Sequence, residues 1–223
     1  MKICIVIPAY NESRTIGSLV GSLCVKGFDV VVIDDGSTDE TGSIAKDKGA
    51  VIIHHDRKNG KGYSLRKGFA YALQHDYEGV IIMDGDGQHD IESIGQFLDM
   101  AEKNKASIIV GNRMTDSRGM PFVRFCTNCL MSWLISLACG QRIADTQCGY
   151  RYISCDVLRK INLTCREFEI ETEILMKARK NGFKVYDMPI ETIYQNEESQ
   201  INPLKDTVRF FAYFIKEVCS LKR

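Results

Sequence analysis

The chain has 223 residues, with 29 basic and 29 acidic side chains, so its formal net charge at pH 7 is zero. This length can bury a sizeable core and fits one large domain, and the balanced charge provides no overall field to attract nucleic acid. Nine cysteines, an odd number, are scattered through apolar segments. With no signal-peptide pattern, this usage favours reduced thiols in a cytoplasmic protein over a disulfide framework. Cys126 and Cys129 have no second ligand pair nearby, which disfavours zinc.

The first half of the chain alternates short apolar runs with segments of helical periodicity. The runs predict strands over residues 2–7, 30–33, 51–53, 80–83 and 108–110. The periodic segments predict helices over residues 16–23, 39–48, 62–73 and 91–102, capped in the first two cases by Ser13 and by Thr38 or Asp39. This alternation predicts an α/β fold with a mostly parallel sheet and flanking helices on both faces.

Three helices are predicted in the second half, over residues 122–139, 170–180 and 203–221. The first is apolar except for a thin stripe made by Arg124, Asn128, Ser132 and Ser136. It is about 27 Å long, marginal for crossing a bilayer, and its polar residues argue against spanning. It therefore belongs either to the core or to a lipid interface.

The last predicted helix has a basic line opposite an apolar one. The basic line is Lys205, Arg209, Lys216 and Arg223, and the apolar line is Phe211, Phe214, Val218 and Leu221. This pattern is typical of a helix on a membrane surface. The alternative is a terminal helix docked on the domain with a solvated basic edge.

The segment Asp84-Gly85-Asp86-Gly87 follows the predicted strand over residues 80–83 directly. Alternation along an extended backbone would point both carboxylates to the same side. Two such close negative charges need a cation, and oxygen ligands suit Mg²⁺ or Mn²⁺. The alternative is a solvated Asp-Gly turn. A calcium-binding EF-hand loop is excluded, because its glycine position holds His89 and its glutamate position holds Gly95.

Two other polar junctions also follow predicted strands, at residues 8–12 and 34–37. In parallel sheets, ligands bind beyond the carboxyl ends of strands, so the position of all three junctions supports a binding site. A dinucleotide fingerprint is excluded because Leu65 stands where a glycine is required after Gly60 and Gly62. There is no Gly-Lys-Ser/Thr triplet for a Walker-type phosphate loop.

These motifs, in this order and spacing, resemble the inverting family 2 glycosyltransferases of the GT-A fold, and most of all the dolichol-phosphate mannose synthases and related polyprenyl-phosphate glycosyltransferases. The matching segments are residues 7–12, 33–39, 59–62, 84–88, 111–113, 145–151, 169–171 and 189–190. The resemblance covers nearly the whole chain. It implies one GT-A domain with a nucleotide-binding half (1–114), an acceptor-side half (115–201) and a terminal amphipathic helix (202–223).

The resemblance also implies roles for individual residues. The nucleotide-sugar donor would be bound by Pro8, Tyr10, Glu12, Ile33, Asp35, Gly85, Asp86, Gln88 and Arg113. Asp84, Asp86 and Gln88 would arrange the Mg²⁺ or Mn²⁺ and the diphosphate, with Arg113 meeting phosphate charge and Arg124 holding the acceptor phosphate. Simpler roles are that Tyr10 packs and that Arg113 pairs with a surface carboxylate. The loop over residues 194–201 departs from the family pattern because it has no cationic residue. This departure argues against clamping of the donor phosphate by the loop, and also against mannose as the transferred sugar.

The expected reaction transfers sugar from a UDP- or GDP-linked donor to a polyprenyl phosphate at the cytosolic face of a membrane, with the enzyme bound there peripherally. A phosphate acceptor is already largely ionised near neutral pH and needs no base. Besides Arg113 and Arg124, the cations available to hold it are Arg118, Arg142 and Arg151. A glycan hydroxyl would need a catalytic carboxylate, for which Glu167, Glu169 and Glu171 are the candidates. A third hypothesis is a non-catalytic nucleotide-binding scaffold.

Overall fold

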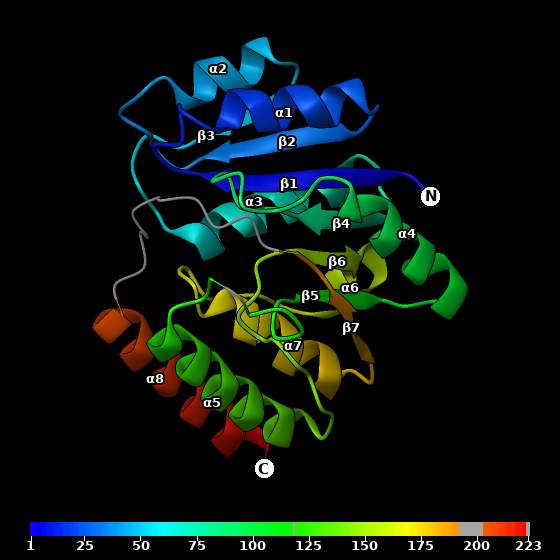
Figure 1. Ribbon diagram of the computed structural model, residues 1–223, viewed down its shortest axis with the longest axis vertical. Helices are drawn as coiled ribbons and strands as arrows, with labels where there is room; N and C mark the ends of the chain where they lie inside the picture. The colour runs from blue at the N-terminus through cyan, green and yellow to red at the C-terminus, as the bar shows by residue number, and fades with distance from the viewer. Residues whose placement is uncertain (118, 192–202, 222–223) are drawn as a thin grey trace.

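The computed structural model describes residues 1–117, 119–191 and 203–221, with side chains of the last segment described from 207 to 219 (Figure 1). The strands are β1 (Ile3–Ala9), β2 (Asp29–Asp34), β3 (Val51–His54), β4 (Gly79–Ile82), β5 (Ile108–Asn112), β6 (Arg151–Ser154) and β7 (Val185–Pro189). The helices are α1 (Ile16–Val25), α2 (Thr41–Asp47), α3 (Lys61–Gln74), α4 (Ser93–Asn104), α5 (Phe122–Cys139), α6 (Cys155–Lys160), α7 (Ile170–Lys180) and α8 (Pro203–Leu221).

The strands form one sheet in the order β3-β2-β1-β4-β6-β5-β7. All neighbouring pairs are parallel except those of β6, which runs antiparallel to both β4 and β5. The predicted mostly parallel α/β fold is therefore confirmed. Strand β6 and helix α6 were not predicted from the sequence.

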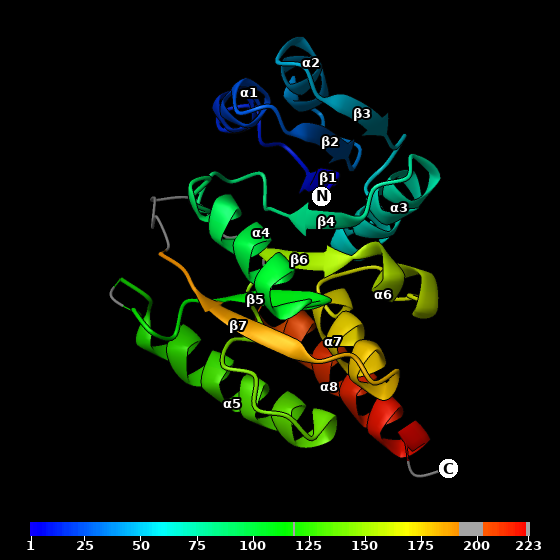
Figure 2. The ribbon, with the colours of Figure 1, turned by 90° about the vertical axis from the view of Figure 1, so that its right-hand side faces the viewer.

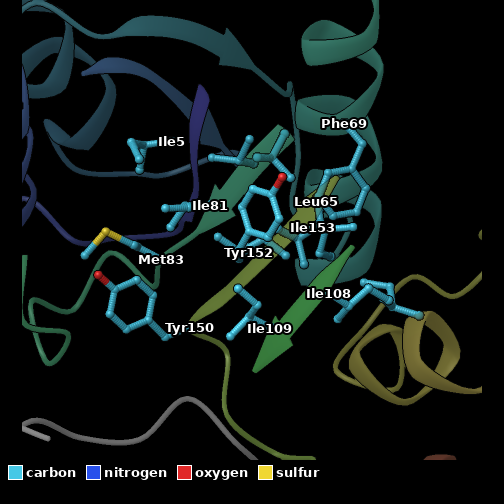
Figure 3. Close-up of a cluster of buried hydrophobic side chains, with 14 of the residues drawn as sticks. Ile5, Leu65, Phe69, Ile81, Met83, Ile108, Ile109, Tyr150, Tyr152 and Ile153 are labelled. Carbon is cyan, nitrogen blue, oxygen red and sulfur yellow. The ribbon is translucent and has the colours of Figure 1, made fainter. Parts of the chain in front are cut away.

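Helices cover both faces of the sheet, so its strands are buried. Figure 2 shows α1 and α4 on one side of the sheet and α3 and α6 on the other. The apolar runs that predicted strands lie in the core, where Ile5, Ile81 and Ile109 are fully buried (Figure 3). Leu65 and Phe69 of α3 pack into the same core. Both faces of the central strands are apolar because neither reaches water.

One of the two predicted helix caps is present. Helix α1 begins at Ile16 after Thr15, and the Ser13 amide instead donates to a carboxylate oxygen of Asp39 at 3.2 Å. Helix α2 follows Glu40, whose own side chain forms no cap hydrogen bond. Asp39, one of the predicted caps, accepts from the amide of Thr41, the first residue of α2, at 3.0 Å. Asp39 therefore connects the junctions after β1 and β2.

The glycines at the start of α3 allow the chain to pack tightly against the segment before α7. Gly60 has φ +102°, a conformation that favours glycine. A β-carbon on Gly62 would lie 2.8 Å from backbone atoms of Cys165, Arg166 and Glu167. These glycines therefore bring the N-terminal half of the chain against the C-terminal half, and this contact places Lys61 beside α7.

We predict opposite effects of alanine at two helical glycines. Gly62→Ala forces a β-carbon into fixed backbone and should lower the free energy of unfolding by about 1–3 kcal/mol. Gly95→Ala in α4, where a β-carbon meets no atom within 4 Å, should raise it by about 0.5–1 kcal/mol. Urea denaturation of the two variants checks this, and equal effects would contradict the close packing at Gly62.

Candidate active site

The carboxyl ends of β1, β2 and β4 bring the three polar junctions together. The Asp35 amide donates to the Ala9 carbonyl at 2.8 Å, and the Thr15 hydroxyl donates to the Gly85 carbonyl at 2.7 Å. A β-carbon on Gly85 would lie 3.3 Å from Cγ of Glu12. The three junctions, far apart in the sequence, therefore form one continuous surface at the edge of the sheet.

Asp35 is buried and orders the loop after β3. His55 Nδ1 lies 2.9 Å from one of its carboxylate oxygens, and the Asn59 amide donates to the same oxygen at 3.0 Å. The Gly60 amide donates to the other oxygen at 2.8 Å. Both oxygens thus accept hydrogen bonds from the chain itself. The expected bond from Asp35 to a nucleoside stays a prediction, and the structure adds a role in shaping the loop that leads to Lys61.

The other expected nucleoside contacts lie around this loop. The Lys58 ammonium is 3.6 Å from the ring centroid of Tyr10, within the range of a cation–π contact. Pro8 and Ile33 are register partners on β1 and β2. Ile33 is fully buried, so it could offer a nucleoside only its backbone. A hollow of about 620 Å³ opens beside the loop and is lined by Ile53, His54, His55, Asp56, Arg57, Asn59, Tyr63 and Lys67.

The ammonium of Lys61 lies between two carboxylates. Its Nζ is 2.6 Å from Oδ1 of Asp84 and 2.8 Å from Oε1 of Glu171. Burial opposes the charge on Lys61, but the two acids raise its pKa. Burial likewise opposes ionisation of Asp84, yet Lys61 and the neighbouring cations lower the pKa of Asp84 to about 2. Lys61 and Asp84 are therefore both charged at physiological pH.

Asp84 and Asp86 do not lie on an extended strand, because β4 ends at Ile82 and residues 85–86 form a turn. The expectation of strand alternation was wrong at this point. Asp86 Oδ1 accepts from the Gln88 amide at 3.0 Å, which fixes the turn. The segment after β4 therefore contains both features that the sequence left as alternatives: the pair of acidic residues and an Asp-Gly turn.

His89 was not among the site residues predicted from the sequence. Its position five residues after Asp84 is the sequence feature that could have indicated it. The Asp84 amide points at His89 Nδ1 at 3.4 Å, and His89 Nε2 is 3.9 Å from Oδ2 of Asp84. The imidazole stacks on the ring of Tyr150, with 4.8 Å between centroids. Burial lowers the pKa of His89 to about 4, although Asp84 opposes this shift. His89 is therefore neutral at physiological pH and supports Asp84 through packing.

Arg113 is paired with a buried carboxylate. Its Nε and one terminal nitrogen lie 2.7 Å and 3.0 Å from the two oxygens of Asp145, and both side chains are buried. The simpler expectation for Arg113 named a surface partner, whereas the partner here is fully buried. A contact from Arg113 to a donor phosphate stays a prediction, and its charge is already balanced within the protein.

Arg151 is a structural residue in this fold. Its fully buried guanidinium donates to the carbonyls of Cys148, Thr146 and Glu171 at 2.7–2.8 Å. It therefore holds the segment before β6 against α7 and is out of reach of an acceptor phosphate. Arg142 is exposed, and Arg118 lies outside the described residues. The loop over residues 194–201, which was expected to lack the cations that clamp the donor phosphate, also lies outside them.

Helix α5 carries its polar stripe inward. Asn128 and Ser132 are buried, and the hydroxyl of Ser132 lies 3.1 Å from that of Thr146 and accepts from the Thr146 amide at 2.9 Å. Ser136 accepts from the Ile143 amide at 3.0 Å. Arg124, one turn before Asn128, is half-buried. In the described part of the chain, α5 alone has the length and hydropathy of a membrane-crossing helix.

The donor atoms of Asp84, Asp86 and Gln88 fit Mg²⁺ or Mn²⁺ in kind, because they are hard oxygen ligands. Across residues 1–117, 119–191 and 203–221, no cluster of three or more His, Cys, Asp or Glu is placed to hold a metal ion. One oxygen of Asp84 also faces Lys61. A metal ion at these residues stays a prediction, and a diphosphate and water would have to complete its ligands.

Comparison with known proteins decides the family, because residues 4–161 match the model described as Glycosyl transferase family 2. The chain belongs to this family and is a glycosyltransferase. It is 27% identical to the UDP-N-acetylglucosamine–dolichyl-phosphate N-acetylglucosaminyltransferase of Methanococcus voltae, covering 86% of each chain. It is 29% identical to the undecaprenyl-phosphate mannosyltransferase of Micrococcus luteus, over 85% of this chain and 83% of the relative.

Among solved structures, glucosyl-3-phosphoglycerate synthase from Mycobacterium tuberculosis in complex with Mn²⁺ and UDP-glucose aligns with a TM-score of 0.74. The alignment covers 98% of this chain and 79% of that one at 19% identity. This likeness shows a shared fold, and together with the family match it confirms the GT-A prediction.

We predict that the family 2 fold depends on the Arg113–Asp145 pair. Asp145→Ala leaves a buried guanidinium without its partner and should cost about 3–5 kcal/mol of unfolding free energy. Asp99→Ala, which removes the partner of Lys103 in an exposed pair 3.7 Å apart, should cost less than about 0.5 kcal/mol. Thermal and urea denaturation check both variants. A small loss for Asp145→Ala would contradict a tight buried pair.

Proposed function

We propose that the protein is a metal-dependent inverting glycosyltransferase that moves a sugar from a UDP- or GDP-linked donor to a polyprenyl phosphate at a membrane surface. The observation that carries the lipid acceptor is the orientation of α5, which turns its polar stripe toward the protein together with Met131, Ile135 and Cys139 and leaves a second apolar face exposed. Relatives named for transfer to dolichyl and undecaprenyl phosphate support the same acceptor class.

The outer face of α5 is a continuous apolar surface. Trp133 and Leu137 are 59% and 62% exposed. The exposed face, spaced at three or four residues, consists of Phe122, Cys126, Cys129, Leu130, Trp133 and Leu137. An apolar helix face of this size, left uncovered in the described structure, is typical of a lipid-binding or protein-binding surface. Its Trp and Leu side chains suit the boundary between headgroups and acyl chains.

Helix α8 adds a second apolar surface at the same end of the molecule. Both views place α5 and α8 at the end opposite α1 and α2 (Figures 1 and 2). Val208, Phe211 and Ile215 are exposed on α8, whereas Phe210 is buried and Phe214 is half-buried. The predicted apolar line is therefore only partly exposed. Phe214 packs on the domain, whereas Val208, Phe211 and Ile215 face outward. Such a pair of faces supports peripheral binding to the cytosolic side of a membrane.

The acceptor phosphate would bind where α5 enters the domain. Arg124 is half-buried at this end of the helix, and Asn128 follows one turn later. Asn128 is buried and its Nδ2 has no hydrogen-bond partner among the described residues. A cation beside an unused buried donor suits an anionic oxygen. The phosphate can attack without a base because it is already ionised near neutral pH.

On the donor side, Asp84, Asp86 and Gln88 would hold the divalent ion, which when bound supplies a Lewis acid for the charge that develops on the departing diphosphate. The chain's own contribution is to fix these ligands. Lys61 and His89 hold Asp84, and the turn holds Asp86. The loop ordered by Asp35 would position the nucleoside, which keeps the anomeric carbon aligned for attack.

A second candidate function is transfer to a glycan hydroxyl, and Glu169 favours it. Of the three predicted catalytic acids, Glu171 pairs with Lys61, and Glu167 lies 3.5 Å from Arg209. One oxygen of Glu169 is buried with no hydrogen-bond partner among the described residues. A carboxylate oxygen without a partner could accept the proton from a hydroxyl acceptor, which is the role of the base that this reaction requires.

The reaction is tested with purified protein, Mn²⁺ and a panel of UDP- and GDP-sugars, with a short-chain polyprenyl phosphate or a soluble glycan as acceptor. We expect transfer to the polyprenyl phosphate, and we expect Asp84→Asn or Asp86→Asn to lower it by about 10²-fold or more. Asp99→Asn, an exposed residue of α4, serves as the control. Transfer to the glycan alone would contradict the lipid acceptor, and nucleotide binding without any turnover would favour a scaffold.

The membrane contact is tested by sedimentation with vesicles of phosphatidylcholine and phosphatidylglycerol. Trp133→Glu and Leu137→Glu each remove an apolar anchor and should weaken binding by about tenfold or more. Val25→Glu changes an equally apolar residue, 89% exposed on α1 at the opposite end, and should leave binding unchanged. Equal binding by all three variants would show that α5 does not face lipid.

A further inference from the structure

The ammonium of Lys61 already contacts the carboxylate of Asp84, which a metal ion would need as a ligand. Its Nζ is 2.6 Å from Oδ1 of Asp84, and the lysine side chain is only 13% exposed. Glu171 holds the same ammonium at 2.8 Å from the other side. A β-carbon on Gly149 would lie 2.5 Å from Oδ2 of Asp84 and 3.1 Å from Nζ of Lys61, so the backbone of this glycine also closes around the pair.

The sequence places this lysine where a positive charge is otherwise unfavourable. Lys61 is the first residue of α3, and the N-terminus of a helix favours negative groups. The helix end therefore provides no stabilisation for the ammonium, which depends on Asp84 and Glu171. Apart from the ring of Phe168, 5.6 Å from Nζ, the contacts that hold the ammonium within the described residues are these two acids. It can exchange one of the acids for another anion that enters the site.

The charges predict competition with a metal ion. A divalent cation bound to Asp84 would lie within a few ångströms of the ammonium, and like charges at such distances in a partly buried site repel strongly. A nucleoside diphosphate changes this balance, because its oxygens offer the ammonium a new partner and the metal the ligands that the protein lacks. The metal and the nucleotide should then bind together.

We propose that Lys61 acts as an internal cation that withholds Asp84 from the metal until a nucleoside diphosphate arrives, and then transfers from Asp84 to the diphosphate. Glu171 stays paired with Lys61 throughout. Because Glu171 belongs to α7, the release of Asp84 is coupled to a helix of the C-terminal half. This inference rests on the proposed function, because it assigns the metal to Asp84 and the nucleotide to the same edge of the sheet.

The test measures Mn²⁺ affinity by electron paramagnetic resonance of the free ion, without nucleotide and with UDP or GDP. Lys61→Met and Lys61→Gln remove the charge, and Lys61→Gln keeps a hydrogen-bond donor in case Lys61→Met fails to fold. In the absence of nucleotide, we expect both folded variants to bind Mn²⁺ at least tenfold more tightly than the wild type. Lys103→Met, which removes an exposed lysine paired with Asp99, should leave the affinity unchanged.

The measurements with UDP or GDP distinguish a failure of this inference from a failure of the proposed function. The wild type should bind Mn²⁺ much more tightly with UDP or GDP than without, and the Lys61 variants should lose most of this difference and bind the nucleotide more weakly. Unchanged or weaker Mn²⁺ binding by both Lys61 variants without nucleotide would overturn the role of Lys61 alone. Failure of the wild type to bind Mn²⁺ with either nucleotide would overturn the metal-dependent function as well.

Discussion

The bridge from Asp84 through Lys61 to Glu171 is the interaction on which the site depends. The edge of the sheet gathers Asp35, Asp84 and Asp86, and like charges this close must be balanced for the fold to hold them there. Asp35 is held by hydrogen bonds from backbone amides and by the contact with His55, whereas Asp84 relies on a lysine. Because that lysine also binds Glu171 of α7, the same contact joins the N-terminal half of the domain to the C-terminal half. Close packing at Gly60 and Gly62 makes the contact possible, since any side chain there would push α3 away from the segment before α7.

Helix α5, which we propose meets the acceptor, is anchored to the domain partly through polar residues. Ser132 and Ser136 hydrogen-bond to the segment between α5 and β6, and Met131 and Ile135 are buried beside them, so that a second apolar face is left outside. This same segment contains Asp145, which fixes Arg113, and it leads into Arg151, which reaches α7. The helix that would meet the lipid is thus tied by a short run of buried hydrogen bonds to the residues that surround Asp84. Such rigid ties suit an enzyme that must present a membrane-bound phosphate to a donor in the aqueous phase.

Much of the fold could be predicted from the sequence, because a sheet buried on both faces requires strands that are apolar throughout, and the runs at β1, β2 and β4 are of that kind. Strand β6 was missed for a physical reason: it begins with a charged residue, Arg151, and the residue pattern does not show that carbonyls of Thr146, Cys148 and Glu171 satisfy this charge in the folded core. The acidic pair was found from its position after β4, but its partners were not, since Lys61 and Glu171 are brought there only by tertiary packing. For α5, the sequence showed the polar stripe but left open which face is buried, and the hydrogen bonds of Ser132 and Ser136 decide it.

The proposed reaction requires that a divalent ion bind at Asp84 and Asp86 together with a nucleoside diphosphate. This can be tested with crystals grown with Mn²⁺ and UDP or GDP, with anomalous data collected at the manganese edge. We expect a manganese peak coordinated by both aspartates and the diphosphate, with the Lys61 ammonium moved from Asp84 to a phosphate oxygen. A bound nucleotide with no manganese at these aspartates, and with Lys61 still on Asp84, would contradict it.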